Sequence, residues 1–272
     1  INRFVKQQGA VPGIQIAHAG RKASAARPWE GAAHLADSAG GWTTVAPSAA
    51  PFGGDLNKVP HALTVDEIRG VQADFAAAAK RSLAAGYEWL ELHAAHGYLA
   101  HQFLSPLSNQ RTDQYGGSFE NRIRFLLETT QAVRAVWPGE LPLTVRISCS
   151  DWVPEGWDLD QSVELARRLR AEGVDLIDCS SGGAVPHAKI PVAPGYQVPF
   201  AERIRREAEI AVAAVGLITE AKQADEIIQS GKADVVLLAR EFLRDPNWPL
   251  HAARLLGHRD AIKPPVQYGR AF

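Results

Sequence analysis

The residue types best suited to chemistry in this sequence are two histidines and a tyrosine, His93, His96 and Tyr98, which lie close together. An imidazole donates or accepts hydrogen bonds and exchanges protons near neutral pH, and a phenol donates a proton. The apolar and aromatic run 87–92 before them is typical of a buried strand, and Gly97 allows the chain to turn sharply. A strand interior has no use for this cluster, whereas the carboxyl ends of the strands of an α/β barrel converge on one pocket. We therefore predict that the three side chains line an active site.

Other strand-like runs also end in residues that could bind a ligand. Apolar, β-branched runs occur at 13–17, 143–148, 175–179, 210–215 and 234–239. The residues at their exits are Gln15, His18, Arg146, Ser180, Ser181, Gly216 and Arg240. If the strands are parallel, these residues meet at the same edge as the histidines.

Helical patterns separate the strands. Thr64 to Glu67 form a capping box before a helix to about residue 85, and Ser118 caps a helix to about residue 136. Further helices are predicted at about 158–172, 199–207, 219–230 and 240–256, and residues 1–8 have the pattern of the last turns of a helix. Hydrophobic strands that alternate with helices indicate a parallel sheet covered on its outside. No Gly-x-Gly-x-x-Gly follows any strand, so a dinucleotide-binding open sheet has no support, and the predicted fold is an α/β TIM (β/α)8 barrel.

The sequence begins in the middle of this pattern. Six strands are predicted, and an open sheet of six would leave two bare edges. The chain starts with Ile1 and contains no Met. We therefore expect two further strand–helix units before residue 1, and we interpret residues 1–272 as one incomplete barrel domain.

Composition excludes several classes of partner. The formal net charge of -1 gives no electrostatic reason to expect nucleic acid or an anionic membrane surface. No apolar run approaches the roughly 20 residues that span a bilayer. Both cysteines, Cys149 and Cys179, lie in apolar strand-like runs, where buried free thiols are expected rather than a disulfide. Free buried thiols fit a reducing cytosol, so we predict a cytoplasmic protein.

Residues 23–63 form a long irregular stretch rich in proline and glycine. Loops of this length inside a compact domain are usually functional, so we predict a lid or a wall of a substrate pocket. Trp29, Trp42 and Phe52 within it could cover an apolar ligand. The alternative is a surface excursion closed by its own small hairpin.

The last two predicted strands indicate a phosphate site. Barrel enzymes often bind a phosphate with the loops after these strands and a nearby helix N-terminus. Gly216 would permit close approach of the backbone, and Arg240 would pair with the charge. The competing interpretation is a structural arginine at the start of a helix.

The motifs around these residues resemble the Old Yellow Enzyme family of FMN-dependent ene-reductases over essentially the whole chain. They are His93-Ala-Ala-His-Gly-Tyr98, Phe103-Leu-Ser-Pro, Asn109-Gln-Arg-Thr-Asp113, Tyr115-Gly-Gly-Ser-Phe-Glu-Asn-Arg122, Gln15-Ile-Ala-His-Ala-Gly-Arg21 and Ala239-Arg240-Glu. The tail 267–272 and the loop around Trp29 resemble the bacterial, xenobiotic-reductase-like branch of that family. The resemblance implies that the first strand of this chain is the third strand of the barrel.

The resemblance also implies where a flavin would lie. Gln15 would hydrogen-bond the polar edge of the FMN ring, because an amide both donates and accepts. Arg146 would place positive charge near flavin N1, and Arg240 would hold the phosphate beside Gly216. Ala239 stands where the family commonly has glycine. An alternative for Arg146 is an internal ion pair.

The same resemblance implies a reaction. His93 and His96 would donate hydrogen bonds to the carbonyl oxygen of an α,β-unsaturated substrate, whose negative charge grows as the C=C bond is reduced. Tyr98 would then protonate the α-carbon. NADPH, or less strongly NADH, would reduce the FMN.

Other interpretations remain open on the residues alone. His18, His93 and His96 could be the three ligands of a metal-dependent hydrolase. Arg270 and Trp29 are placed in the substrate pocket by the resemblance, Arg270 by reaching a neighbouring subunit, which would require a homo-oligomer. A frayed terminus is the simpler interpretation of the tail.

Four charged residues were given no role in the chemistry. Arg21 and Lys22 are interpreted as pocket edge or as solvated residues. Asp151 and Glu155 are interpreted as solvated loop acids.

The chain itself could also be an inactive piece of an ene-reductase.

Overall fold

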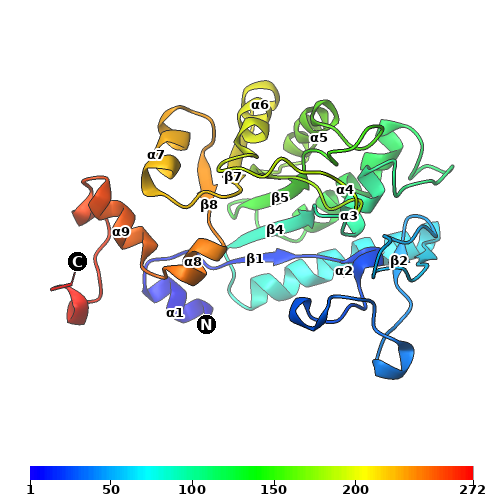
Figure 1. Cartoon of the computed structure of the whole chain (residues 1–272), viewed down its shortest axis with the longest axis horizontal. Helices are drawn as coiled ribbons and strands as arrows, with labels where there is room; N and C mark the ends of the chain where they lie inside the picture. Colours follow the sequence, from blue (N-terminus) through cyan, green and yellow to red (C-terminus); the bar gives the residue numbers. More distant parts are fainter. Residues whose placement is uncertain (272) are drawn as a thin grey trace.

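The computed structural model describes residues 1–271, and its centre is a six-stranded parallel sheet (Figure 1). The strands follow the order β1-β4-β5-β6-β7-β8 across the sheet. Their bounds are β1 Gly13–Ile16, β4 Trp89–Ala94, β5 Leu143–Ser148, β6 Leu176–Ser180, β7 Ala211–Val215 and β8 Val235–Leu237. All six predicted strands are therefore confirmed. Within residues 1–271 the sheet does not close on itself, and β1 and β8 are its two edges.

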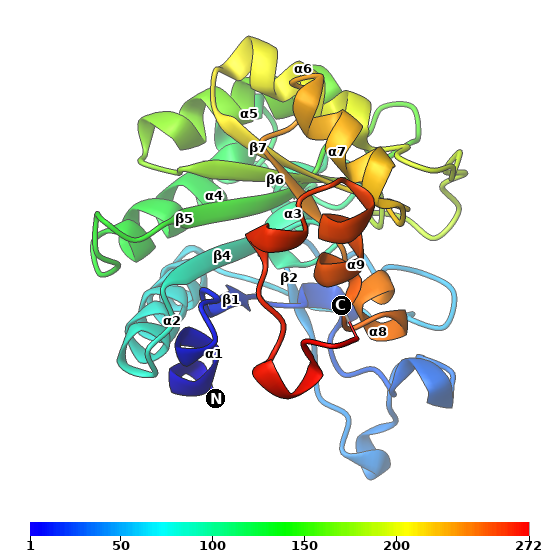
Figure 2. The ribbon, with the colours of Figure 1, turned by 90° about the vertical axis from the view of Figure 1, so that its left-hand side faces the viewer.

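The helices connect successive strands and cover the outside of the sheet (Figure 1). They are α1 Asn2–Gln7, α2 Val65–Ala84, α3 Leu99–Leu104, α4 Phe119–Arg134, α5 Leu159–Ala171, α6 Val198–Ala208, α7 Ala221–Gln229, α8 Arg240–Arg244 and α9 Trp248–Leu255. The predicted capping box is present at Thr64 and Glu67, and Ser118 caps α4. Helix α9 packs beside α7, and Figure 2 shows α8 and α9 apart from α4 and α5.

Two helical segments differ from the prediction. The helix predicted at 240–256 is divided into α8 and α9, because Pro246 disfavours helical backbone at Asp245, which has φ -131° and ψ 89°. Helix α3 was not predicted. All its residues are buried, so its sequence carries no amphipathic pattern. None of the helices within 1–271 is long and apolar enough to cross a membrane.

The strands bury one face under the helices and present polar residues on the other. Leu90, Leu92 and Ala94 of β4 are almost fully buried among the core side chains, and Glu91 and His93 alternate with them. The parallel register places His93 beside Arg146 of β5, which in turn lies beside Asp178 of β6. The inner face of the sheet therefore carries a row of ionisable side chains at the level of the predicted site.

The long stretch 23–63 contains isolated antiparallel bridges between Ala25 and His34 and between Gly53 and Leu56. Its two short strands, β2 Val45–Ala46 and β3 His61–Ala62, pair in parallel. Arg21 fixes the stretch to the barrel end, because its guanidinium donates to the backbone oxygens of Ala50, Pro51 and Ala184. Arg21 is only 3% exposed, so the interpretation of a solvated residue is wrong. Cys149 and Cys179 are buried free thiols, as predicted.

Candidate active site

The structure brings the two predicted histidines and the tyrosine into direct contact. Strand β4 runs two residues further than predicted and includes His93, which is 8% exposed. His93 Nε2 lies 3.3 Å from His96 Nδ1. The Tyr98 ring stacks on the His93 ring with centroids 4.8 Å apart and an interplanar angle of 21°. A short turn after one strand thus gathers all three groups.

Hydrogen bonds around the two imidazoles define one consistent proton arrangement. His93 Nδ1 accepts from the Ala95 backbone N–H at 3.1 Å, so its Nε2 carries the proton and donates to His96 Nδ1. His96 Nε2 then carries a proton and donates to Ser180 Oγ at 2.7 Å. The Ser180 hydroxyl in turn donates to Gln197 Oε1 at 3.4 Å. Both imidazole N–H groups are therefore engaged within the protein, and one of these bonds has to open before a ligand receives it.

Burial keeps both rings neutral. It lowers the pKa of His93 to about 4 and that of His96 to about 3, and the nearby positive charge of Arg146 acts in the same direction. Near pH 7 the two rings are uncharged hydrogen-bond donors. Lys22 is close to them, since its Nζ donates to the backbone oxygen of His96 at 2.9 Å, and burial lowers its pKa to about 8.

Arg146 has an internal partner on the next strand. Its Nε lies 3.1 Å from Asp178 Oδ2, and Asp178 is fully buried. Neither Arg146 Nε nor either carboxylate oxygen of Asp178 has a hydrogen bond of good geometry within residues 1–271. Burial raises the pKa of Asp178 above its ordinary value, against the opposing effect of Arg146. The predicted alternative of an internal ion pair is thus present, and the Arg146 side chain remains 23% exposed on the inner face.

Gln15 lies on the same face, near the edge of the sheet. Its amide Nε2 donates to Glu91 Oε1 at 2.7 Å, and Thr144 Oγ1 donates to the second oxygen of Glu91 at 3.2 Å. Glu91 and Asp178 were not predicted as site residues. A charged residue inside an otherwise apolar strand was the signal in both cases, and alternation places each of them on the inner face.

The predicted phosphate site is a small pocket of about 80 Å³ between the exits of β7 and β8. Gly216 has φ +119°, and a Cβ there would lie 2.8 Å from Gln197 Nε2, so glycine is required. Ala239 adopts a negative φ of -113°, outside the left-handed region that favours glycine. Arg240 begins α8, lines the pocket and is exposed, with no hydrogen bond or ion pair to residues 1–271. An open arginine, a glycine cradle and a helix start fit the phosphate of FMN.

Two buried polar residues behind the histidine turn were missed. His101 and Asp151 are both fully buried, and His101 Nε2 lies 2.9 Å from Asp151 Oδ1. Asp151 Oδ2 accepts from Ser105 Oγ at 2.6 Å and from the Trp157 backbone N–H at 2.8 Å. Burial acts to raise the pKa of Asp151, but His101 and these donors outweigh it and the pKa is lowered. The interpretation of Asp151 as a solvated acid is wrong, whereas Glu155 is exposed as expected.

The remaining candidates lie apart from this cluster. Trp29 is 78% exposed, and Arg270 is exposed in the C-terminal tail. His18 lines a separate pocket with Val71, Asp74 and Phe75 against α2. No group of three His, Cys, Asp or Glu side chains within 1–271 is placed to hold a metal, so the hydrolase alternative is not favoured.

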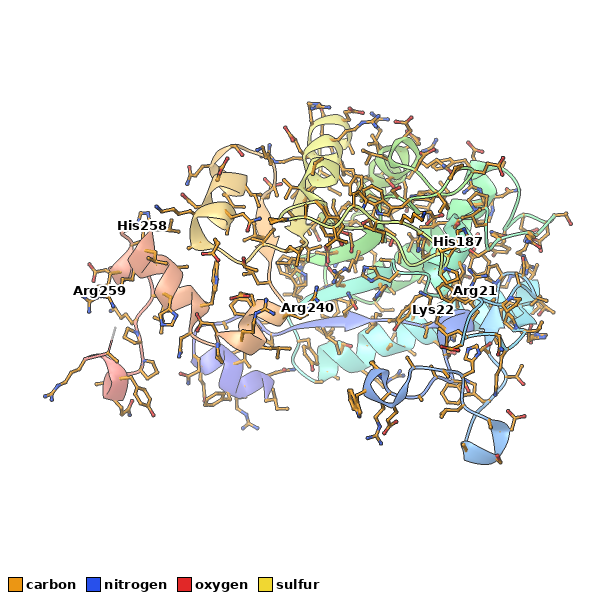
Figure 3. All side chains as sticks on the ribbon, in the orientation of Figure 1. Arg21, Lys22, His187, Arg240, His258 and Arg259 are labelled. Carbon is orange, nitrogen blue, oxygen red and sulfur yellow. The ribbon has the colours of Figure 1, made fainter. Side chains whose placement is uncertain are left out.

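Figure 3 shows how the labelled basic side chains divide between the ends of the molecule. Arg21, Lys22 and His187 lie together at the end where the long loop leaves the sheet. Arg240 lies apart from them, on α8. His258 and Arg259 lie at the opposite end, remote from the histidine turn.

Comparison with known proteins gives a consistent result. Residues 1–258 match the NADH:flavin oxidoreductase / NADH oxidase family. An NADPH dehydrogenase of Bacillus velezensis is 51% identical over 268 residues, which cover 98% of this chain and 73% of that protein. An NADPH dehydrogenase of a Geobacillus species is 52% identical over 269 residues, covering 99% of this chain and 73% of that protein.

Solved structures agree. Morphinone reductase in complex with tetrahydroNAD superposes with a TM-score of 0.72 at 28% identity, covering 98% of this chain and 71% of that one. The Old Yellow Enzyme homologue from Zymomonas mobilis superposes with a TM-score of 0.72 at 25% identity, covering 98% and 72%.

Proposed function

Because this chain belongs to the NADH:flavin oxidoreductase / NADH oxidase family, we propose that it reduces the activated C=C bond of α,β-unsaturated carbonyl compounds. The family and its NADPH dehydrogenase members confirm the prediction of an FMN-dependent oxidoreductase that uses NADPH or NADH. The solved relatives confirm the predicted barrel fold class. The proposal therefore concerns the substrate and the roles of individual residues.

The observation that carries the proposal is the pair of neutral imidazoles at the end of β4, with Arg146 beside His93 in the sheet register. Developing negative charge on a carbonyl oxygen is stabilised by preorganised N–H donors in a site from which water is excluded. Both rings stay uncharged near pH 7 because burial depresses their pKa values. Each neutral ring therefore carries one N–H group that can donate to such an oxygen.

The remaining roles follow from position. FMN, when bound and reduced by the nicotinamide, would supply the hydride for the substrate. Arg240 and the backbone at Gly216 would hold its phosphate, and Gln15 and Arg146 would meet its ring. Tyr98 stands against His93 and would deliver a proton to the α-carbon.

The two imidazoles can donate to a substrate only after their present hydrogen bonds have rearranged. His96 Nε2–H now donates to Ser180 Oγ, and His93 Nε2–H donates to His96 Nδ1. A carbonyl oxygen that receives both N–H groups would replace both of these acceptors, so the number of hydrogen bonds that the two rings donate is conserved. Ser180 would then keep Gln197 as its partner.

We also propose that the stretch 23–63 forms one wall of the substrate pocket. The Phe52 ring centroid lies 4.0 Å from Lys22 Nζ, and Lys22 in turn contacts the His96 backbone. The stretch is therefore one side chain away from the catalytic turn. Trp29 is too exposed to support a direct contact in this conformation.

An anaerobic spectroscopic cycle tests the proposed function. The purified protein, incubated with FMN and desalted, is expected to be yellow, to bleach on adding NADPH and to recolour on adding 2-cyclohexenone. The same cycle with NADH gives the nicotinamide preference. A protein that stays colourless after incubation, or that bleaches and does not recolour with enones, contradicts the proposal.

A further inference from the structure

The turn that carries the histidines is strained. Its residues 95–98 are closed by a bond from the Tyr98 N–H to the Ala95 oxygen at 3.0 Å. His96 has φ +56° and Gly97 has φ +70°, so two consecutive residues lie in the left-handed region. A residue with a Cβ, such as His96, adopts this conformation only at a cost in free energy. Such a turn keeps its shape only when its surroundings fix it.

Four side chains bind every backbone polar group of the two strained residues. The His96 N–H donates to Ser148 Oγ at 2.9 Å, and the His96 oxygen accepts from Lys22 Nζ at 2.9 Å. The Gly97 N–H donates to His101 Nδ1 at 2.8 Å, and the Gly97 oxygen accepts from Gln102 Nε2 at 2.7 Å. These bonds come from β5, from the loop after β1 and from α3, so three separate parts of the chain hold the turn.

The ring of His101 faces a buried carboxylate on the side away from Gly97. Because its Nδ1 accepts from Gly97, its proton is on Nε2, which faces Asp151 Oδ1 at 2.9 Å. That contact does not have the geometry of a full hydrogen bond, so the carboxylate acts mainly through its charge. Asp151 is in turn anchored by Ser105 and by the Trp157 backbone. The charge favours the tautomer that leaves Nδ1 free to accept.

We infer that His101, held in one tautomer by Asp151, is a positioning residue: through the Gly97 N–H it fixes the turn that sets His93, His96 and Tyr98. The inference rests on the proposed function for its catalytic consequence. The geometric part, that the Nδ1 bond controls the turn, stands independently of any activity. His101 is fully buried on α3, and its two ring nitrogens face Gly97 and Asp151.

Two substitutions separate the two nitrogen atoms of the ring. In His101→Asn the amide oxygen occupies the place of Nδ1 and can still accept from Gly97, but the contact with Asp151 is lost. In His101→Gln the amide nitrogen reaches the place of Nε2 and still faces Asp151, but the Gly97 N–H loses its acceptor. If the pair His101–Asp151 acts only on stability, His101→Asn should have the lower Tm of the two variants. A positioning role makes the Gln variant the less active.

Hydrogen exchange and kinetics are measured on the FMN-loaded wild type and on both variants. We expect exchange of the Gly97 amide to accelerate about tenfold or more in His101→Gln and to stay near the wild-type rate in His101→Asn. Because a misplacement of about 1 Å can reduce turnover roughly 100-fold, kcat for 2-cyclohexenone should fall about 10- to 100-fold in the Gln variant with FMN affinity unchanged. The Asn variant should keep kcat within about threefold of wild type, even where its Tm is the lower of the two.

Nitrogen-15 spectra of labelled histidine give a readout that needs no activity. In the wild type His101 is expected as the Nε2–H tautomer, and the His93 and His96 signals should move in the Gln variant more than in the Asn variant. Equal loss of kcat in both variants, or unchanged Gly97 exchange in His101→Gln, overturns the inference. If the wild type does not reduce enones, the proposed function fails, and the exchange rates and tautomer signals still decide whether His101 holds the turn.

Discussion

The segments that follow β4 and β8 differ in how many of their polar groups are hydrogen-bonded within the protein. At the β4 exit, all four backbone polar groups of His96 and Gly97 are bound by side chains of the chain itself. At the β8 exit, Ala239 and Arg240 are exposed, and the Arg240 guanidinium has no partner among residues 1–271. One site is saturated with internal bonds and the other is left open.

The contrast reflects what each proposed ligand brings. A carbonyl compound carries little charge before it reacts, so the groups that stabilise its transition state have to be placed in advance. A phosphate carries its own charge and several acceptor oxygens, so donors left open are satisfied when it binds. Substitutions at the β4 exit should therefore lower stability and turnover, whereas removal of the open charge at the β8 exit should chiefly lower the affinity for FMN.

The largest effect is expected from Gly97→Ala. An added Cβ would lie 2.0 Å from the Gly183 backbone oxygen, and the φ of +70° disfavours alanine as well. Overpacking and φ strain together should lower the free energy of unfolding by about 2–5 kcal/mol, measured by urea denaturation. Gly117→Ala is the matched control, since Gly117 has φ +80° and nothing within 4 Å of the new Cβ. Equal losses in the two variants would mean that close packing at the turn is unimportant.

The next effect concerns turnover. His93→Ala and His96→Ala should each reduce kcat for enones about 100- to 1,000-fold, because each removes one preorganised donor. FMN affinity, followed by fluorescence titration, should stay unchanged. Since the two rings share a hydrogen bond, the double variant should lose less than the product of the single losses. Normal enone reduction by both single variants would refute the donor role.

Acidification should lower the free energy of unfolding, because His93 and His96 at the β4 exit are neutral in the folded protein. The folded pKa values of about 4 for His93 and about 3 for His96 lie below the ordinary 6.5, so the unfolded state binds more protons between these values. The stability they contribute is complete above pH 6.5 and is lost as the pH falls toward 4. For His93 alone the loss reaches roughly 3 kcal/mol, at about 1.4 kcal/mol for each pKa unit.

Asp178 opposes this trend, so the histidine contribution is measured as a difference. Its folded pKa is raised, and its contribution therefore grows as the pH falls. The free energy of unfolding is compared between wild type and His96→Gln from pH 7.5 to 5, values that bracket the ordinary histidine pKa of about 6.5. The wild type should lose stability relative to the variant on acidification. A constant difference would show that His96 is not neutral by burial.

At the β8 exit, Arg240→Ala should weaken FMN binding about 10- to 100-fold, the value of a charge-assisted hydrogen bond. The unfolding free energy of the FMN-free protein should stay nearly unchanged, because the Arg240 guanidinium is exposed and has no hydrogen bond or ion pair within residues 1–271. Arg259→Ala removes the same charge at the remote end of the molecule and serves as the control (Figure 3). Equal weakening in both variants would place the phosphate elsewhere.

Part of the fold and of the candidate site can be predicted from the sequence. Local chemistry predicted the helix starts at Thr64 and Ser118, because a capping side chain and its backbone partner are three residues apart. Strand exits predicted which polar residues share a face, including Gly216 and Arg240. These features need no knowledge of distant contacts.

What was missed depends on partners far along the chain. Asp151 was taken for a solvated acid because its partner His101 lies in a helix that has no amphipathic pattern. Arg146 could not be paired with Asp178 until the register of β5 and β6 was known. The strain at His96 is likewise invisible in the sequence, since it depends on donors from three parts of the chain.

The smallest effect is expected from Ala239→Gly, which restores the glycine common in the resembling family. Ala239 has a negative φ of -113°, outside the left-handed region that favours glycine, and it is exposed, so its methyl group does not fill the core. Glycine should lower the unfolding free energy by only about 0.4–1 kcal/mol, through the greater entropy of the unfolded chain. FMN affinity, measured by titration, should change less than about threefold, because Arg240 supplies the charge that the phosphate needs. A gain of tenfold or more in affinity would show that the alanine methyl obstructs the phosphate, and that the open design of the β8 exit is compromised in this chain.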